Sequence, residues 1–162
     1  MLIREYTPKD WNELVHLMNS FENYLVKLDN LKRLKPFKDK GKRYTALVLK
    51  NIKESKGKIF VAVDRVKIVG FISVILEKQE KSSELEVGKT RYGRIVDLYI
   101  DKVYRKKGLG TKLLEEGEKY LRTKKCQVLS VEVFSPNKKA YPFYKRSGYV
   151  DRCSELVKII SK

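Results

Sequence analysis

The sequence has few of the residues that bind metals or cross-link chains. Cys126 and Cys153 are its only cysteines and His16 is its only histidine, and their positions lack the ligand spacing of a zinc site. We therefore expect two reduced thiols and no metal. No apolar run approaches the ~20 residues of a membrane-spanning helix, and residues 1–6 lack the features of a signal peptide. These absences predict a soluble, cytoplasmic protein.

The basic residues far outnumber the acidic ones. Thirty-seven Lys and Arg against 20 Asp and Glu give 162 residues a net charge of +17. Such an excess favours a polyanionic partner: nucleic acid, an acidic membrane surface or a phosphorylated cofactor. No recognised nucleic-acid-binding motif is present.

The basic residues are densest over residues 27–43, where apolar residues recur about every three positions. The apolar residues are Leu28, Leu31, Leu34 and Phe37. This spacing predicts a partly helical segment, which Pro36 and Gly41 interrupt. The segment is either a solvated surface over a buried leucine stripe or a docking surface for an acidic partner.

The order of predicted helices and strands indicates a single α/β domain over residues 1–162. The length and the 42% hydrophobic content suit one core. Periodicity predicts strands at 2–6, 59–63, 68–75, 94–100, 128–133 and 156–160, and helices beginning near 8 and covering 44–55, 108–124 and 140–147. Because strands precede and follow the 108–124 helix, we expect a mixed sheet flanked by helices.

A glycine-containing segment separates the 94–100 strand from the helix that follows it. Its residues are Arg105-Lys106-Lys107-Gly108-Leu109-Gly110-Thr111. Backbone amides at a helix N-terminus favour an anion, and glycine lets the backbone approach it closely. The segment lacks the third glycine of a dinucleotide fingerprint and the Gly-Lys-Ser/Thr of a P-loop. It predicts a phosphate cradle of another kind.

Two blocks of the sequence resemble the GNAT family of N-acetyltransferases. Asp97–Leu114 is similar to that family's acetyl-CoA-binding segment, a strand followed by Arg/Gln-x-x-Gly-x-Gly/Ala and a helix. A second block resembles the family's next strand and helix, and comprises residues 131–137 with Ala140, Phe143, Tyr144, Gly148 and Tyr149. The resemblance implies the acyl-CoA N-acyltransferase fold and transfer of acetyl from acetyl-CoA to a primary amine.

The resemblance also implies where acetyl-CoA would bind. Backbone groups of Leu98, Tyr99 and Ile100 would hold the acetyl carbonyl and the pantetheine arm. The amides of residues 105–111 would bind the pyrophosphate, with positive charge from Arg105, Lys106 and Lys107. Asn137 would hydrogen-bond the pantetheine or thioester end.

Two groups suit the charge that develops when an amine attacks a thioester. A backbone N–H near Leu98 would stabilise the oxyanion, and such a donor is typically worth ~3–4 kcal/mol. The resemblance places Tyr144 near the sulfur, where a phenol of ordinary pKa ~10 can protonate the departing thiolate. Pro142 departs from the expected helix, which we therefore expect to begin near Tyr141 or to be kinked.

Two carboxylates are candidate bases for the attacking amine, whose ordinary pKa is ~10.4. Glu132 interrupts an apolar strand and matches a glutamate that serves as base in the ribosomal-protein N-terminal acetyltransferases. Asp97 lies within the strand, immediately before the expected acetyl site. Either could instead be a solvent-facing or ion-paired residue, and a water chain could also serve. Arg94 lies where some histone-type members have their glutamate, so that mechanism has no support in this sequence.

The acceptor is less well defined by the sequence. Four glutamates, Glu77, Glu80, Glu84 and Glu86, reverse the local charge and either attract a cationic amine or pair with neighbouring lysines on a hairpin. The likeness around Glu132 favours a protein N-terminus or lysine, while a small amine or an aminoglycoside-like compound stays open. Two alternative functions are a basic nucleic-acid- or ribosome-associated module and a family member that binds acyl-CoA without turnover.

Overall fold

The computed structural model describes residues 1–36 and 38–160. By their contacts these residues form two units, Met1–Glu132 and Val133–Lys162, each of which is described by itself. The first unit contains β1 (Leu2–Glu5), α1 (Trp11–Leu28), α2 (Lys40–Glu54), β2 (Lys58–Asp64), β3 (Lys67–Glu77), α3 (Lys81–Val87), β4 (Tyr92–Ile100), α4 (Leu109–Thr123) and β5 (Val128–Val131), with short 3-10 turns η1 (Pro8–Asp10) and η2 (Lys102–Tyr104). The second unit contains α5 (Ala140–Arg146).

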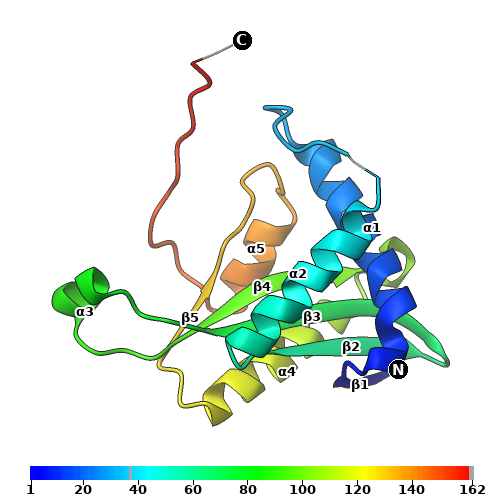
Figure 1. Ribbon diagram of the computed structural model, residues 1–162, viewed down its shortest axis with the longest axis horizontal. Coiled ribbons are helices and arrows are strands. Elements are labelled where there is room, and N and C mark those ends of the chain that lie inside the picture. Colours follow the sequence, from blue (N-terminus) through cyan, green and yellow to red (C-terminus); the bar gives the residue numbers. More distant parts are fainter. Residues whose placement is uncertain (37, 161–162) are drawn as a thin grey trace. The chain divides into compact units, whose positions relative to one another are not determined.

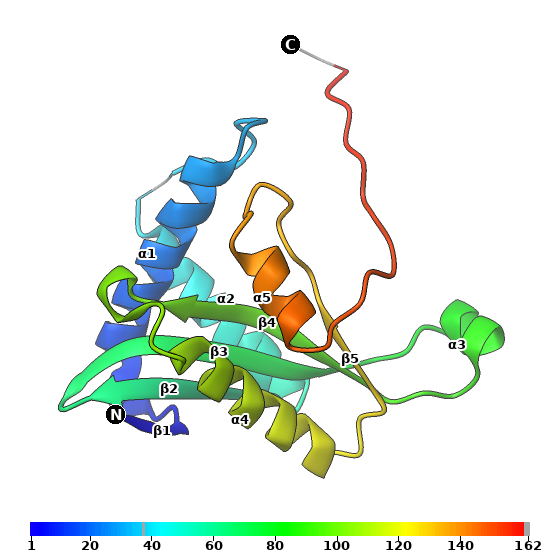
Figure 2. The ribbon, with the colours of Figure 1, turned by 180° about the vertical axis from the view of Figure 1, so that it is seen from behind.

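The first unit is built on a five-stranded sheet in the order β1-β2-β3-β4-β5. The first four strands pair antiparallel, and β5 pairs parallel to β4. The chain passes through α4 between these parallel strands, since a parallel pair needs a long crossover. Helices α1 and α2 cover one face of the sheet, and α4 covers the other (Figures 1 and 2). The predicted α/β class with a mixed, helix-flanked sheet is confirmed.

Both faces of the sheet are buried by apolar side chains. Leu14, Leu17 and Met18 of α1 and Val48 of α2 pack against Ile59, Val61, Val63, Ile68, Phe71 and Tyr99. On the other face, α4 buries four leucines: Leu109, Leu113, Leu114 and Leu121. Gly117 brings α4 close to β3, because a Cβ there would lie 2.9 Å from Ile72 and from Val74. The strands are thus held from both sides.

A bulge in the middle of β4 changes which face its side chains occupy. Asp97 pairs with Ser73 and Ile95 pairs with Val74, so Val96 is an extra residue. Pairing with β5 ends at Ile95. Within the described residues, the outer edge of β4 beyond Ile95 has no strand partner.

The structure corrects the expectations for residues 27–55. Helix α1 ends at Leu28, and Gly41, expected to interrupt a helix, lies in the first turn of α2. A Cβ on Gly41 would lie 2.5 Å from the Asn19 Cβ, so glycine here allows α1 and α2 to approach closely. Leu31 is exposed rather than buried. Leu47 on α2 is also exposed, because the buried face of α2 carries Gly41, Thr45 and Val48. Phe37, part of the expected leucine stripe, lies outside the described residues.

Three other segments also differ from expectation. Much of the predicted acidic hairpin is the short helix α3, which has no buried residue. The strand expected at 128–133 ends at Val131, and residues 151–160 form no strand. Helix α5 begins at Ala140, so Pro142 falls in its first turn, where its missing N–H costs no helical hydrogen bond. Among the described helices, none is long and apolar enough to cross a membrane.

Candidate active site

The predicted phosphate cradle is an exposed turn that leads into α4. Lys106 and Gly108 have positive φ values of 61° and 73°, and Gly108 is the N-cap of the helix. The amides of a first helical turn have no intrahelical acceptor, and the helix dipole adds partial positive charge there. A Cβ on Gly108 would meet nothing within 4 Å, so the space beside this turn is open. Leu109, which is buried, anchors the turn to the sheet.

Arg105 holds the base of this turn. Its Nε donates to the Ile100 carbonyl at 2.9 Å. Its guanidinium carbon lies 5.2 Å from the ring centroid of Tyr24 and 5.3 Å from that of Tyr99. The side chain of Arg105 therefore ties the turn to the end of β4, while Lys106 and Lys107 are exposed.

The free edge of β4 lies directly before this turn in the chain. The Asp101 amide donates to the Val69 carbonyl on β3 at 2.9 Å. Backbone groups alternate between the two sides of an antiparallel strand. The N–H and C=O of Tyr99 therefore point to β3, like those of Asp101, whereas the N–H and C=O of Leu98 and Ile100 point to the free edge. Of the three residues expected to offer backbone groups to acetyl-CoA, Leu98 thus presents both of its groups where no strand competes. Ile100 presents its N–H there, while its carbonyl accepts from Arg105 Nε.

Asp97 is the most enclosed carboxylate of the site. Its side chain points toward the α1/α2 face and the residue is 4% exposed. The Tyr44 hydroxyl donates to Asp97 Oδ1 at 3.0 Å, and the Ser73 hydroxyl donates to Oδ2 at 2.9 Å. Burial raises the pKa of Asp97 to about 6, the two hydrogen bonds lower it, and the negative charge of Glu22 raises it. Burial, and then the charge of Asp97, raise the pKa of the Tyr44 phenol.

A buried ion pair borders this network. Lys40 Nζ lies 2.7 Å from Glu22 Oε2, and the two side chains are 11% and 9% exposed. Glu22 is on α1, and Lys40 is one turn before Tyr44 on α2. The negative charge of Glu22 acts on Asp97 without a hydrogen bond between them.

Glu132 has a different environment. It follows the last residue of β5, and its carboxylate lies 2.8 Å from an Arg94 nitrogen, with the side chain 78% exposed. Arg94 also contacts Glu77 at 3.0 Å. The glutamate is thus the exposed end of a Glu77–Arg94–Glu132 chain, while Asp97 is enclosed.

Two of the predicted site residues belong to the second unit. Tyr144 is on α5, with its ring centroid 5.1 Å from that of Phe143 and 5.6 Å from that of Tyr149. Asn137 closes a turn before α5, since its amide donates to Phe134 and its carbonyl accepts from Ala140. Both residues are held by local structure of their own unit.

Ser73, Tyr44 and Glu22 belong to the surroundings of Asp97 but were not predicted from the sequence. Ser73 had a visible signal, because it is a polar residue within the apolar run Phe71–Ile75. Glu22 had a weaker one, as a carboxylate on the apolar face of α1. Tyr44 lies 53 positions from Asp97, and local periodicity does not predict such a contact.

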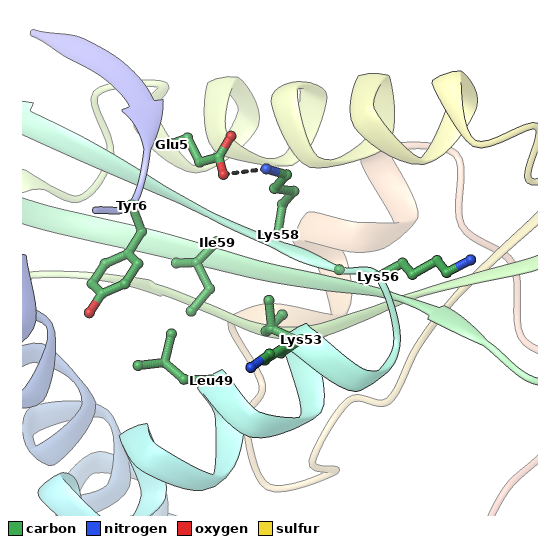
Figure 3. A pocket seen from close by; sticks show the side chains of 9 residues that line it. Glu5, Tyr6, Leu49, Lys53, Lys56, Lys58 and Ile59 are labelled. Atoms are coloured by element: carbon green, nitrogen blue, oxygen red, sulfur yellow. Dashed lines mark hydrogen bonds and ion pairs between the residues drawn. The ribbon is translucent and has the colours of Figure 1, made fainter. Parts of the chain in front are cut away.

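A surface hollow of about 260 Å³ lies elsewhere, between β1, α2 and the start of β2. Figure 3 shows its apolar lining of Tyr6, Leu49 and Ile59 and its rim of Lys53, Lys56 and Lys58. Lys58 is paired with Glu5. None of the predicted site residues lines this hollow, so we do not assign the chemistry to it.

Comparison with known proteins identifies a family. A family model described as the acetyltransferase (GNAT) family matches residues 14–149. No curated sequence relative matches the chain.

Solved structures share the fold over the whole chain. A mutant form of the BH1408 protein from Bacillus halodurans is 23% identical, with a TM-score of 0.79, covering 100% of this chain and 99% of that one. An aminoglycoside antibiotic 6'-N-acetyltransferase from Acinetobacter haemolyticus is 12% identical with a TM-score of 0.71, covering 100% and 99%. Glucosamine-6-phosphate N-acetyltransferase from Arabidopsis thaliana is 20% identical with a TM-score of 0.66, covering 99% and 98%. At these identities the likeness shows the fold alone.

Proposed function

Because the chain belongs to the acetyltransferase (GNAT) family, we propose that it transfers the acetyl group of acetyl-CoA to a primary amine. The observation that carries the proposal is the free edge of β4 at Leu98 and Ile100, followed directly by an open turn at a helix N-terminus. The free strand edge can pair with an extended amide-containing chain such as pantetheine, and the amides of the helix N-terminus can bind a diphosphate.

The residues of the first unit at this edge fit acetyl-CoA. Amides of residues 105–111 would hold the diphosphate, and the Leu98 carbonyl and the Ile100 N–H would pair with the pantetheine arm. The family resemblance adds Asn137 of the second unit, which would hydrogen-bond the pantetheine or thioester end. When bound, acetyl-CoA supplies an activated thioester carbonyl.

Asp97 is our preferred base. Its pKa of about 6 leaves most of the carboxylate ionised at pH 7, yet close enough to neutrality to accept a proton efficiently. Tyr44 and Ser73 fix its orientation. Glu132 is the second candidate, and its exposed pairing with Arg94 suits a structural role better.

Two other groups complete the proposed reaction. The Leu98 N–H, which points to the free edge, would donate to the oxyanion as the amine attacks the carbonyl. Tyr144 would give its phenolic proton to the departing thiolate. The products are an acetylated amine and free coenzyme A.

The acceptor is proposed to be a primary amine of a protein N-terminus, a lysine or a small molecule. The aminoglycoside and glucosamine-6-phosphate acetyltransferases that share this fold act on small amines by their names. The Lys-rich 27–43 segment supports an acidic partner as well, since Lys27, Lys32, Arg33, Lys35 and Lys38 are all exposed. We place the protein in the cytoplasm.

Coenzyme A binding tests the cradle. Gly108→Glu should lower the affinity at least tenfold, because the carboxylate would stand against the diphosphate. Gly88→Glu is the matched control: Gly88 ends α3, has the same φ of 73°, and a Cβ there also meets nothing within 4 Å. Equal affinities of the two variants by calorimetry would contradict the proposal.

A turnover screen tests the activity itself. Thiol release from acetyl-CoA would be followed with peptide, lysine, polyamine and aminoglycoside acceptors, and the acetylated product identified by mass spectrometry. We expect at least one amine class to be acetylated. Tight coenzyme A binding with no turnover on any class would favour the non-catalytic alternative.

A further inference from the structure

We propose that Glu22 and Lys40 are positioning residues for the candidate base: their ion pair holds Tyr44 against Asp97 and sets the charge that Asp97 carries near neutral pH. The inference rests on the proposed function for its catalytic meaning. Its physical content, a charge coupling between three named side chains, can be measured without turnover.

The ion pair is enclosed, which sets it apart from the surface pairs of the same unit. The Lys40 Nζ and Glu22 Oε2 atoms are 2.7 Å apart, with about a tenth of each side chain exposed. The Lys50–Glu54 pair, also on α2, has 72% and 64% exposed side chains and a 3.9 Å separation. Removing one partner of an enclosed pair leaves a charge with little water around it, so its effect on neighbouring groups is large.

The helices are built to hold this pair beside Asp97. Gly41 packs directly against Asn19, so α1 and α2 are in close contact next to Lys40. Lys40 and Tyr44 are four residues apart on α2 and therefore lie on the same side of the helix. Glu22 is three residues after Asn19 on α1. The close α1–α2 contact that brings the Lys40 ammonium to Glu22 thus also brings the Tyr44 hydroxyl to Asp97.

The groups that face Asp97 come from three elements. Ser73 on β3 and Tyr44 on α2 donate hydrogen bonds that stabilise the carboxylate. Glu22 on α1 opposes its ionisation through its negative charge. Lys40 compensates that charge by direct contact with Glu22. Glu22 and Lys40 therefore have opposite effects on the ionisation of Asp97.

Substituting the two residues separately should move Asp97 in opposite directions. In Lys40→Met nothing compensates the negative charge of Glu22, so Asp97 should ionise at a higher pH, by at least about half a unit. In Glu22→Gln the repulsion is gone and Asp97 ionises at a lower pH by a similar amount. The double variant should ionise at a pH no higher than the unmodified protein does.

Carboxylate carbon NMR with labelled aspartate measures this directly, with Asp97→Asn assigning the resonance. Lys50→Met is the matched control, because it removes an exposed lysine from the same helix and should leave the Asp97 titration unchanged. Lys40→Arg keeps the charge and should restore the unmodified midpoint. If Lys40→Met fails to fold, Glu22→Gln still tests the coupling, since its shift to lower pH does not depend on that variant.

The outcomes separate this inference from the proposed function. Opposite shifts in the two single variants support the coupling, and a matching displacement of the pH–rate profile supports its catalytic meaning. Opposite shifts in a protein that acetylates nothing would keep the coupling and remove the proposed function. Unchanged titration in both variants, or shifts in the same direction, would overturn the inference.

Discussion

Ser73 on β3 and Asp97 on β4 exchange two hydrogen bonds across the sheet. The Ser73 hydroxyl donates to Asp97 Oδ2 at 2.9 Å, and the Asp97 amide donates to Ser73 Oγ at 3.1 Å. The pair lies where β4 bulges at Val96. Ser73 thus contacts both the backbone and the side chain of Asp97 at the bulge. The same residue orients the candidate base and stabilises the irregular part of β4.

We expect Asp97→Asn to reduce turnover by roughly 10²- to 10⁴-fold, because an amide cannot accept the proton of the acceptor amine. The Michaelis constant for acetyl-CoA should change little, since the cradle at residues 105–111 is untouched. Steady-state kinetics with both substrates varied would check this. Turnover within about threefold of the unmodified protein would exclude Asp97 as base.

Asp97→Asn should also change how stability depends on pH. The pKa of Asp97 is about 6 in the folded protein against an ordinary value of 3.8, so between these values the folded state binds more protons than the unfolded chain. The contribution of Asp97 to the free energy of unfolding therefore falls as pH rises from about 4 to 6. Relative to the unmodified protein, the asparagine variant should gain up to roughly 2–3 kcal/mol over that interval. Urea denaturation at pH 4 and pH 7.5 measures the difference, and a gain that does not grow with pH would contradict the raised pKa.

Glu132→Gln distinguishes the two candidate bases. The glutamate contributes an exposed pair with Arg94, and such pairs are worth about 0–1 kcal/mol. If Asp97 is the base, we expect the rate and its pH dependence to stay within about twofold. Loss of the alkaline-rising limb of the profile in this variant, with that limb retained in Asp97→Asn, would transfer the role to Glu132.

Tyr144→Phe should slow acetyl transfer by roughly 10²-fold and leave coenzyme A affinity unchanged, because only the proton donor to the thiolate is lost. Tyr141→Phe is the matched control on the same helix. Its hydroxyl donates to Asp151 at 2.8 Å, and its loss should leave the rate near that of the unmodified protein. Equal rates for both variants would remove Tyr144 from the mechanism.

Asp10 should stabilise the fold in a pH-dependent way. Two Arg4 nitrogens at 2.7 and 2.8 Å and the Thr7 amide at 2.7 Å donate to its carboxylate. The Arg4 hydrogen bonds, despite burial, hold the pKa of Asp10 well below its ordinary 3.8. This stabilisation is present above that ordinary value and is lost as pH falls below it. We expect Asp10→Asn to cost about 2 kcal/mol at pH 7, from hydrogen bonds to a charged group, and clearly less near pH 2. Thermal denaturation at the two pH values tests this, and an equal cost at both would contradict it.

The sequence by itself determined the fold class, the family and the glycine-containing turn before α4. These follow from local signals: strand and helix periods, the inward leucines of α4, and Gly108 at the turn before that helix. The family expectation is confirmed by the match over residues 14–149. Such signals are readable because the residues that act together are close in the chain.

Only the tertiary structure decided which groups surround Asp97. Tyr44, Ser73 and Glu22 come from three elements, and their meeting depends on the β4 bulge and on the Gly41–Asn19 contact. Leu47 and Leu31 show the same limit, since helical spacing marks apolar positions without saying which side of a helix the sheet will cover. The ionisation of Asp97 depends on its burial and on contacts with residues far away in the sequence, and the residues next to it in the chain predict neither.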